Sequence, residues 1–195
     1  AQDLANALNT ATNGLQDIRK RADDEIKIGV DKLNRLLAQF EIANNTVKQE
    51  TAVGGNPNDA LDERDTLLKQ ISELIGVTSV RRENDDLALY TSDGTVLFET
   101  IARDVTFVPT SVYGAATVGN SISIDGVALK SGVGPDTSAK GSLQGLLQLR
   151  DEIAPLYQSQ LDEVARGLIY AFSEQDPNPL GDRVQGLFIG SAVAT

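Results

Sequence analysis

The sequence predicts an α+β protein, mainly α, built as an elongated antiparallel helical rod that carries a small antiparallel β unit. Apolar residues recur at alternating steps of three and four over residues 1–50, and the apolar period changes to two after residue 77. Aromatic residues make up only 5% of the chain, which fits a rod packed on Leu, Ile, Val and Ala. We therefore expect three helices with coiled-coil-like packing, and a β unit inserted between the second and the third.

The first expected helix covers residues 1–50 and would be about 70 Å long. No proline interrupts it, and its apolar stripe has heptad spacing with one stutter between Ala22 and Leu33. We expect this helix to fray around Gln49 and Glu50. The stripe consists of Leu4, Leu8, Ala11, Leu15, Ile18, Ala22, Ile26, Val30, Leu33, Leu37, Phe40 and Val47.

A second helix should follow a loop at 51–58, because Gly-Gly and Asn-Pro in that stretch are strong helix breakers. We expect Asp59 to be its N-cap and Gly76 to take the left-handed position after its end. The loop is short, so this helix should fold back along the C-terminal part of the first. Its expected apolar stripe is Leu61, Leu68, Ile71 and either Leu74 or Ile75.

Period-two segments then predict the antiparallel β unit. Asp93-Gly94 and Asp125-Gly126 are tight hairpin turns, because both residue types tolerate positive φ. A small, glycine-rich loop is expected at 111–119. The expected strands and final hairpin are 77–81, 87–91, 96–99, 105–108 and 122–129, with a polar turn at 83–86.

Ser142 is the expected cap of the third helix, and Pro155 predicts a kink or an early boundary near Arg150. The apolar stripe of this helix is expected at Leu147, Arg150, Ala154, Tyr157, Leu161, Val164, Leu168 and Ala171. The predicted organisation is a helical rod domain at 1–76 and 141–175, a β subdomain at 77–140, and a loop or the start of a truncated further region at 176–195. A linker at 131–141 is expected to lead from the β strands to the third helix.

The first helix is much longer than the other two, so part of its stripe is left without a partner in this chain. Missing terminal segments or neighbouring subunits would have to cover it. The candidate helix-packing and assembly residues are Leu4, Leu8, Leu15, Ile18, Ile26, Leu33, Leu37, Leu161, Val164 and Leu168. The chain also lacks Met, and we therefore expect it to be an internal fragment.

Composition argues against most catalytic chemistry. The chain has no Cys and no His, which removes disulfides, thiol nucleophiles, imidazole bases and the usual Zn or Fe ligands. The net charge is −11, a balance that repels the phosphate backbone of nucleic acids. No apolar run is long enough to cross a membrane. We expect no cofactor, no metal, no catalytic residue, no nucleic acid and no membrane contact.

Paired acidic residues raise one enzymatic alternative, a cell-wall hydrolase that works with two carboxylates. The pairs are Asp23-Asp24, Asp85-Asp86 and Asp151-Glu152, of which Asp85 and Asp86 would be the ones to test. Neighbouring residues on a helix point to different faces, so solvated charge explains these pairs better. A Ser-Lys nucleophile is left open by composition.

Two segments resemble the hook-associated protein 1 family of the bacterial flagellum. The first is LDERDTLLKQISELIGV at 61–77, followed by the Asp93-Gly94 turn where that family has a D-G or N-G turn. The second is GSLQGLLQLRD at 141–151, followed by QLDEVARGL at 160–168. Residues 176–179 depart from the family pattern, because the His that often follows is missing.

The resemblance implies a structural protein that polymerises as a ring between the hook and the filament. It also implies export through the flagellar type III apparatus to the cell exterior, with terminal helices that supply a core coiled coil. The implied partners are copies of itself, the hook protein, the second junction protein or flagellin, and an export chaperone for the full-length chain. A helical sensor, a signalling module or another coiled-coil interaction module is the alternative, and a sensor would need a membrane anchor.

Overall fold

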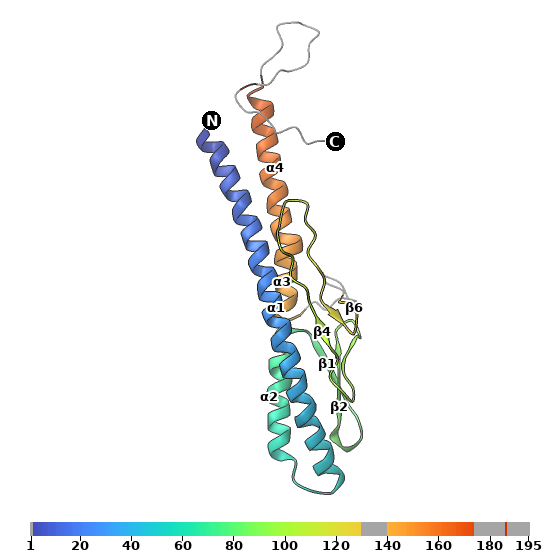
Figure 1. Ribbon diagram of the computed structural model, residues 1–195. Helices are drawn as coiled ribbons and strands as arrows, with labels where there is room; N and C mark the ends of the chain where they lie inside the picture. The colour runs from blue at the N-terminus through green and yellow to red at the C-terminus, as the bar shows by residue number, and fades with distance from the viewer. Residues whose placement is uncertain (1, 130–139, 174–185, 187–195) are drawn as a thin grey trace.

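The computed structural model describes residues 2–129, 140–173 and 186. One long helix, α1 (Gln2–Ala52), runs the length of the molecule (Figure 1). Two shorter antiparallel segments lie end to end along it: α2 (Asn58–Leu74) beside its C-terminal half, then α3 (Ser142–Gln148), the π-helical turn η2 (Leu149–Ile153) and α4 (Ala154–Ala171) toward its N-terminus. The predicted mainly-α rod with a small antiparallel β unit is confirmed.

Two three-stranded antiparallel sheets form the β unit, and both lie on one side of the rod. In the first, β2 (Leu87–Thr91) pairs with β1 (Val77–Arg81) and with β3 (Val96–Phe98), and a 3₁₀ turn η1 (Glu83–Asp85) joins β1 to β2. The second sheet has the order β4 (Val105–Thr106), β5 (Ser123–Ile124) and β6 (Val127–Ala128). All the predicted strands exist, although β4 is shorter than expected.

One hydrophobic core joins the rod to the β unit. Ile26, Leu33 and Phe40 of α1 are completely buried, as are Ile71 of α2 and Phe98 of β3. The rings of Phe40 and Phe98 meet edge to face, with centroids 5.3 Å apart. Because this core is continuous, the division into a rod domain and a β subdomain at residue 76 stays a prediction.

The helix ends differ in detail from those predicted. α1 continues through Ala52, and α2 begins at Asn58, so Asp59 lies inside the first turn instead of capping it. Gly76 is not left-handed: the residue before it is already extended, and the Gly76 N–H donates to the carbonyl of Lys140 at 2.8 Å. The packing of the chain after residue 139 against this end therefore decides how α2 stops.

Glycine is needed at 141, one residue before α3. Ser142 is the first helical residue, so the cap predicted there is wrong. Gly141 takes the cap position with a φ of 98°, and a Cβ at this position would lie 2.5 Å from the carbonyl oxygen of Leu74. The end of α2 and the start of α3 therefore touch backbone to backbone.

The sequence predicts a kink or an early boundary near Arg150, and there the α-helical hydrogen bonding of α3 ends and is followed by the π-helical turn η2. A π turn adds one residue to the helix and rotates everything that follows. The predicted stripe is correct through Ala154, but Gln158 is buried where Tyr157 was expected, and Tyr157 is exposed. In α2 a similar error occurs, because Leu67 and Arg64 are buried while Leu61 and Leu68 are only half-buried.

Alanine substitutions at the two glycines inside α1 should have opposite effects on the stability of the chain. A Cβ at Gly14 would meet nothing within 4 Å, whereas a Cβ at Gly29 would lie 2.7 Å from the buried Leu143 side chain. We expect Gly14→Ala to raise the free energy of unfolding by up to about 1 kcal/mol, through helix propensity. We expect Gly29→Ala to lower it by about 1 kcal/mol, because overpacking outweighs that gain. Urea unfolding followed by circular dichroism measures both, and equal stabilisation by both variants would contradict the close approach of α3.

Candidate assembly interface

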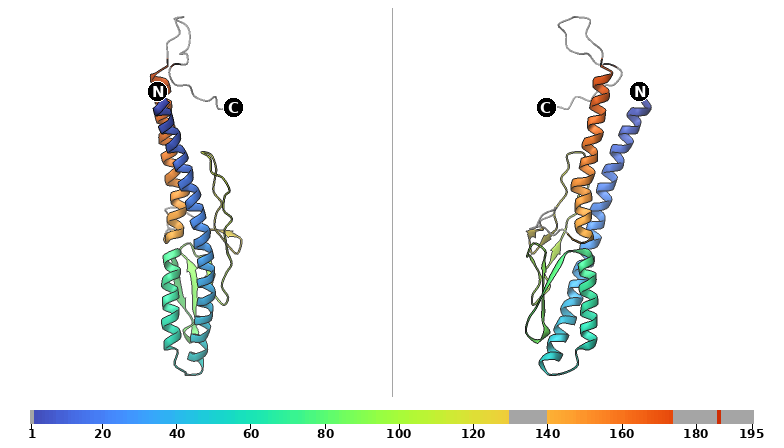
Figure 2. Two further views of the ribbon diagram at one scale, coloured as in Figure 1. Left: turned by 60° about the vertical axis from the view of Figure 1, so that its left-hand side comes forward. Right: turned by 180° about the vertical axis from the view of Figure 1, so that it is seen from behind.

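The two ends of the rod differ in how much of α1 is covered by other elements. Beside α2 and the strands, α1 is buried on its inner face, whereas nearer its N-terminus only α4 runs beside it among the described elements (Figure 2). Exposure follows this change: Leu4 is 41% exposed and Val164 is 52% exposed. Apolar side chains at this end therefore lie at the surface.

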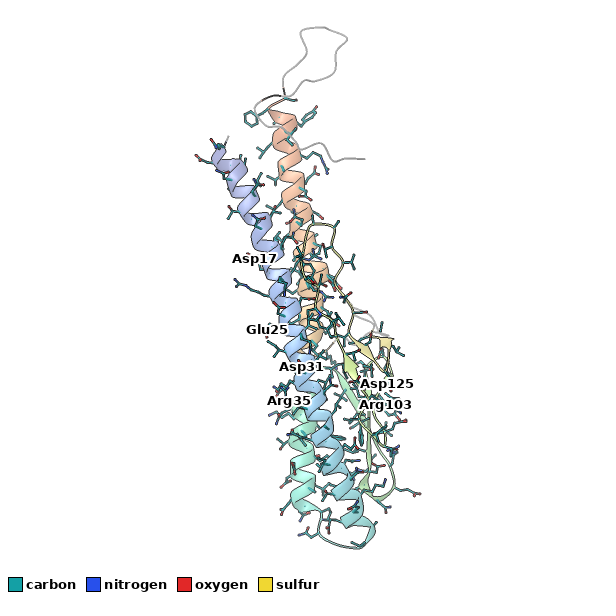
Figure 3. The ribbon with its side chains drawn as sticks, viewed as in Figure 1. Asp17, Glu25, Asp31, Arg35, Arg103 and Asp125 are labelled. Atoms are coloured by element: carbon teal, nitrogen blue, oxygen red, sulfur yellow. The ribbon has the colours of Figure 1, made fainter. Side chains whose placement is uncertain are left out.

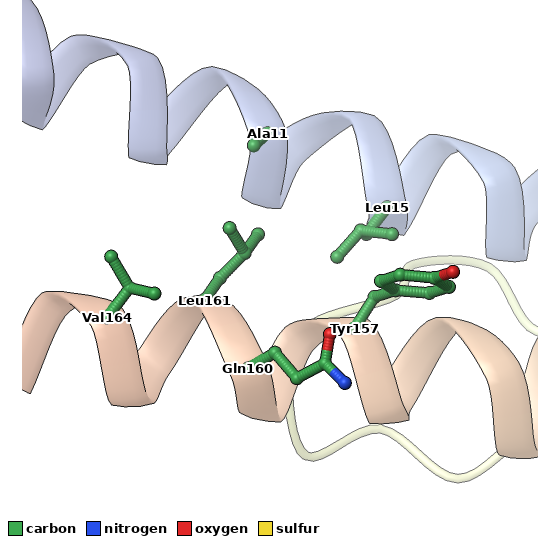
Figure 4. A pocket seen from close by; sticks show the side chains of 6 residues that line it. All are labelled: Ala11, Leu15, Tyr157, Gln160, Leu161 and Val164. Carbon is green, nitrogen blue, oxygen red and sulfur yellow. The ribbon is translucent and has the colours of Figure 1, made fainter.

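An apolar groove, the open groove, lies between α1 and α4. Figure 4 shows Leu15 and Ala11 of α1 facing Leu161 and Val164 of α4 across it, with the ring of Tyr157 at one end. The groove has a volume of about 390 Å³, and Gln160 is the remaining lining residue. Heptad-spaced apolar residues on two adjacent helices form the usual docking surface for a further helix.

The predicted assembly residues divide into two groups. Those buried in the core beside α2 and the strands are Ile26, Leu33 and Leu37. Those at the open end, half-buried or exposed, are Leu4, Leu8, Leu15, Ile18, Leu161, Val164 and Leu168. The first group is fully occupied inside this chain. Only the second has surface available for assembly, and that role stays a prediction.

At the base of the open groove, a buried ion pair ties α1 to the π turn. Asp23 and Arg150 have side chains that are 0% and 1% exposed, and the Arg150 Nη1 donates to Asp23 Oδ1 at 2.6 Å. The same carboxylate accepts the Thr110 backbone N–H at 2.6 Å and the Tyr113 hydroxyl at 2.7 Å. Asp23 therefore joins three parts of the chain, and its charge is fully compensated.

Further partners fix Arg150 in the charged state. Its Nη2 donates to the carbonyl of Asn120 at 2.8 Å and to Asp151 Oδ2 at 2.7 Å. Burial alone would lower the pKa of Arg150, but the carboxylates of Asp151 and Asp23 outweigh it and raise the pKa above its usual value. Burial also raises the pKa of the Tyr113 hydroxyl, which keeps its proton to donate to Asp23.

Arg19 fastens the glycine-rich loop to the same place. It occupies the buried position that the sequence assigned to Ile18, which is instead 43% exposed. Its Nε donates to the carbonyl of Arg150 and its Nη1 to that of Gly114, both at 3.0 Å, and its guanidinium lies 4.6 Å from the centre of the Tyr113 ring. The four side chains Arg19, Asp23, Tyr113 and Arg150 form one unit, called here the Asp23 cluster.

A second polar unit, the Asn44 cluster, ties α2 and the strands to the other half of α1. It consists of Asn44, Arg64 and Asp86, all buried. The Asn44 Nδ2 donates to Asp86 at 2.6 Å, and its Oδ1 accepts from Arg64 at 3.1 Å and from the Leu87 backbone at 3.0 Å. Burial lowers the pKa of Arg64.

The structure shows what surrounds Asp85 and Asp86, the paired acids of the hydrolase alternative. Asp86 is engaged by Asn44 and Arg82, and Asp85 forms a surface ion pair with Arg81. Each carboxylate thus has a different structural partner. Among the described residues, no group of His, Cys, Asp or Glu is arranged to hold a metal ion. None of the described helices has both the length and the apolar character of a membrane span.

Sequence reasoning missed both clusters, although the signal was present. Arg64 lies in the family-like segment 61–77 and Arg150 in the segment 141–151, and each directly precedes an aspartate and falls in phase with the apolar stripe of its helix. An arginine at a stripe position of a packed helix needs a buried anionic or carbonyl partner. Periodicity could have identified the two arginines, but it could not identify Asp23 or Asn44 as their partners.

Comparison with known proteins identifies relatives along most of the chain. Residues 1–182 match the family described as "Flagellar hook-associated protein FlgK helical domain". "Flagellar hook-associated protein 1" of Escherichia coli is 26% identical over 178 residues, which cover 90% of this chain and 32% of the relative. The protein of the same name from Bacillus subtilis is 26% identical over 200 residues, covering 91% and 39%. The chain thus spans about a third of the length of the curated relatives it matches.

Removing the charge of Asp23 should lower the free energy of unfolding far more than removing the charge of its neighbour Asp24. Asp23→Asn leaves the buried Arg150 without its fully buried carboxylate partner, and we expect the free energy of unfolding to fall by about 3 kcal/mol. The control is Asp24→Asn, because Asp24 is 52% exposed and pairs only with Lys20 at the surface, so we expect a change below about 0.5 kcal/mol. Chemical denaturation measures both, and equal effects would show that the ion pair is dispensable.

Proposed function

The chain belongs to the flagellar hook-associated protein family whose helical domain it matches, and from this premise we propose that it is part of a subunit that joins the hook to the filament. The family has a structural role in the bacterial flagellum, and the finer assignment to the junction is ours. In this role the chain makes and breaks no covalent bond. It acts as an adaptor between two helical assemblies of different mechanics.

The observation that carries the proposal is the open groove between α1 and α4. A chain that folded for itself alone would bury such a surface, because heptad-spaced apolar side chains gain free energy when a further helix covers them. The occupant we propose is helical: the terminal segments of the full-length protein or neighbouring copies. A subunit whose helices complete one another in this way is suited to a polymer.

The partners follow from the same role. We propose a ring of copies, in contact with the hook protein on one side and with the second junction protein or flagellin on the other. We propose further that the full-length chain meets an export chaperone and leaves the cell through the flagellar type III system, to act outside the cell. The absence of cysteine is compatible with such a route, because no disulfide has to be broken or formed for the chain to be exported unfolded and then to refold.

The two buried polar clusters suit a subunit under mechanical load. Each fixes the register of an antiparallel segment on α1 through several directional hydrogen bonds to side chains and carbonyls. A slide of either segment by one helical turn would separate these partners and leave charged side chains buried and unpaired. We propose that this fixed register is what lets the rod transmit torque without rearranging.

Deletion of the gene tests the proposal directly. We expect cells that keep their hooks but lack filaments, and we expect flagellin in the medium, because filament subunits would be exported with nothing to hold them. Electron microscopy of the cell surface and analysis of secreted proteins measure both outcomes. Normal filaments and normal swimming in the deletion strain would refute the junction role.

The open groove should also be required for assembly. In the full-length protein, Leu161→Asp places a charge on its floor, and we expect at least roughly tenfold fewer cells with filaments, because a buried unpaired carboxylate is costly. Leu156→Asp is the matched control, since Leu156 is on the same helix, is 58% exposed and does not line the groove. Complementation of the deletion strain is the assay. Equal function of both variants would remove the groove from the mechanism.

A further inference from the structure

A second heptad-spaced stripe runs along the exposed side of α1, away from the core. Its members are separated by alternating steps of four and three, and every one is exposed: Arg21, Glu25, Ile28, Lys32, Arg35, Gln39, Ile42 and Thr46. Ile28 is 59% exposed and Ile42 is 69% exposed. Steps of four and three are the spacing of any one side of an α-helix, so the notable feature is that this solvent-facing side carries two exposed isoleucines, a residue type suited to helix-to-helix docking. We call these residues the outer stripe.

The outer stripe carries excess positive charge on an acidic chain. It contains three cations and one carboxylate, although the whole chain has a net charge of −11. The cations next to it, Lys20 and Lys27, form ion pairs with Asp24 and Asp31 on the same helix, but Arg21, Lys32 and Arg35 form none among the described residues. Figure 3 shows Glu25 and Arg35 on the flank of α1 that faces away from the β unit. Arg103 and Asp125 lie on the opposite side, in the β unit.

The complementary surface is on α2. An exposed stripe with the same three-and-four spacing runs along the side of α2 opposite to Arg64, Leu67 and Ile71. This acidic stripe consists of Asp59, Asp62, Thr66, Lys69 and Glu73. It has three carboxylates and one cation, the reverse of the outer stripe, and the described residues include no ion pair that neutralises it. The two stripes are on different helices, so they form two distinct faces of one molecule.

The two stripes also match in height along the rod. The hydrogen bond from the Arg64 side chain to Asn44 holds those two residues within about one helical turn of the same level, and α1 and α2 run antiparallel. Counting equal steps from that level along each helix puts Arg35 level with Glu73, and Ile42 level with Thr66. The same count puts Gln39 level with Lys69 and Thr46 level with Asp62. An ion pair, an apolar contact and two polar contacts would form if the stripes met.

We propose that the outer stripe of α1 docks on the acidic stripe of α2 in a second copy of this chain, with the two copies side by side and parallel. The inference rests on the proposed function and deepens it, because it names the surface and the partner for lateral contact between subunits. The contact joins unlike faces, so each copy of a pair still has one unused stripe, which can bind a further copy. Such head-to-tail contacts extend into a ring or a tube, whereas a contact of one face with itself would stop at a dimer.

Charge reversal and exchange in the full-length protein test the contact. Arg35→Glu and Glu73→Arg each place like charges together at every copy-to-copy contact, and we expect each to reduce the fraction of cells with filaments by roughly tenfold or more. The double variant exchanges the two charges and should restore filaments. Glu63→Arg is the control, since it reverses an exposed charge of α2 outside the acidic stripe, and we expect normal filaments from it.

Cross-linking gives a second and more direct test, because the chain has no cysteine of its own. Cells that express Ile42→Cys and Thr66→Cys versions together should yield a cross-linked pair of subunits, and either version alone should yield none. Failure of the exchange to restore filaments, or no cross-link in assembled flagella, would overturn the proposal and indicate a different occupant. If gene deletion removes filaments but both charge-reversed variants assemble normally, this inference fails and the proposed function stands.

Discussion

The buried pair of Asp23 and Arg150 is the contact on which the upper half of the rod depends. At this point directional bonds to one carboxylate and one guanidinium join α1, the π turn and the segment that contains Thr110 and Tyr113. Two unpaired charges in this place would cost several kcal/mol each. The surrounding donors and carbonyls compensate the two charges only in one arrangement of the three segments, so this arrangement is strongly favoured.

The Asn44 cluster repeats this arrangement in the lower half. In both places an arginine on the shorter helix reaches a polar side chain on α1, and a loop or strand of the β unit supplies the remaining bonds. The β unit therefore does more than cover one side of the rod. It closes two polar clusters that would otherwise be open to water, and it fixes where each shorter helix lies along α1.

A rod only two helices thick has a large surface for its volume. Two parts of that surface, the open groove and the outer stripe, differ in chemistry. The open groove is apolar and lies between helices, which suits a further helix that becomes a permanent part of the fold. The outer stripe is charged with a few isoleucines, which suits contact between finished subunits. A protein that folds first and assembles afterwards needs both kinds, because surfaces that are too apolar would aggregate before they reach the right partner.

The sequence by itself determined the architecture. Apolar residues recur at steps of three and four in the helices and at steps of two in the strands, and Gly, Pro and Asp-Gly mark the turns between them. These patterns located the helices and strands of the described residues to within a few residues, because they act through the local backbone. Only the tertiary structure decided which charged residues are buried and where the third helix changes phase. The partner of Arg150 lies 127 residues away at Asp23, and no local pattern encodes a contact across that separation. Pro155 locates an irregularity near Arg150 from the sequence, but only the structure shows that it is a π-helical turn, which shifts the buried position from Tyr157 to Gln158.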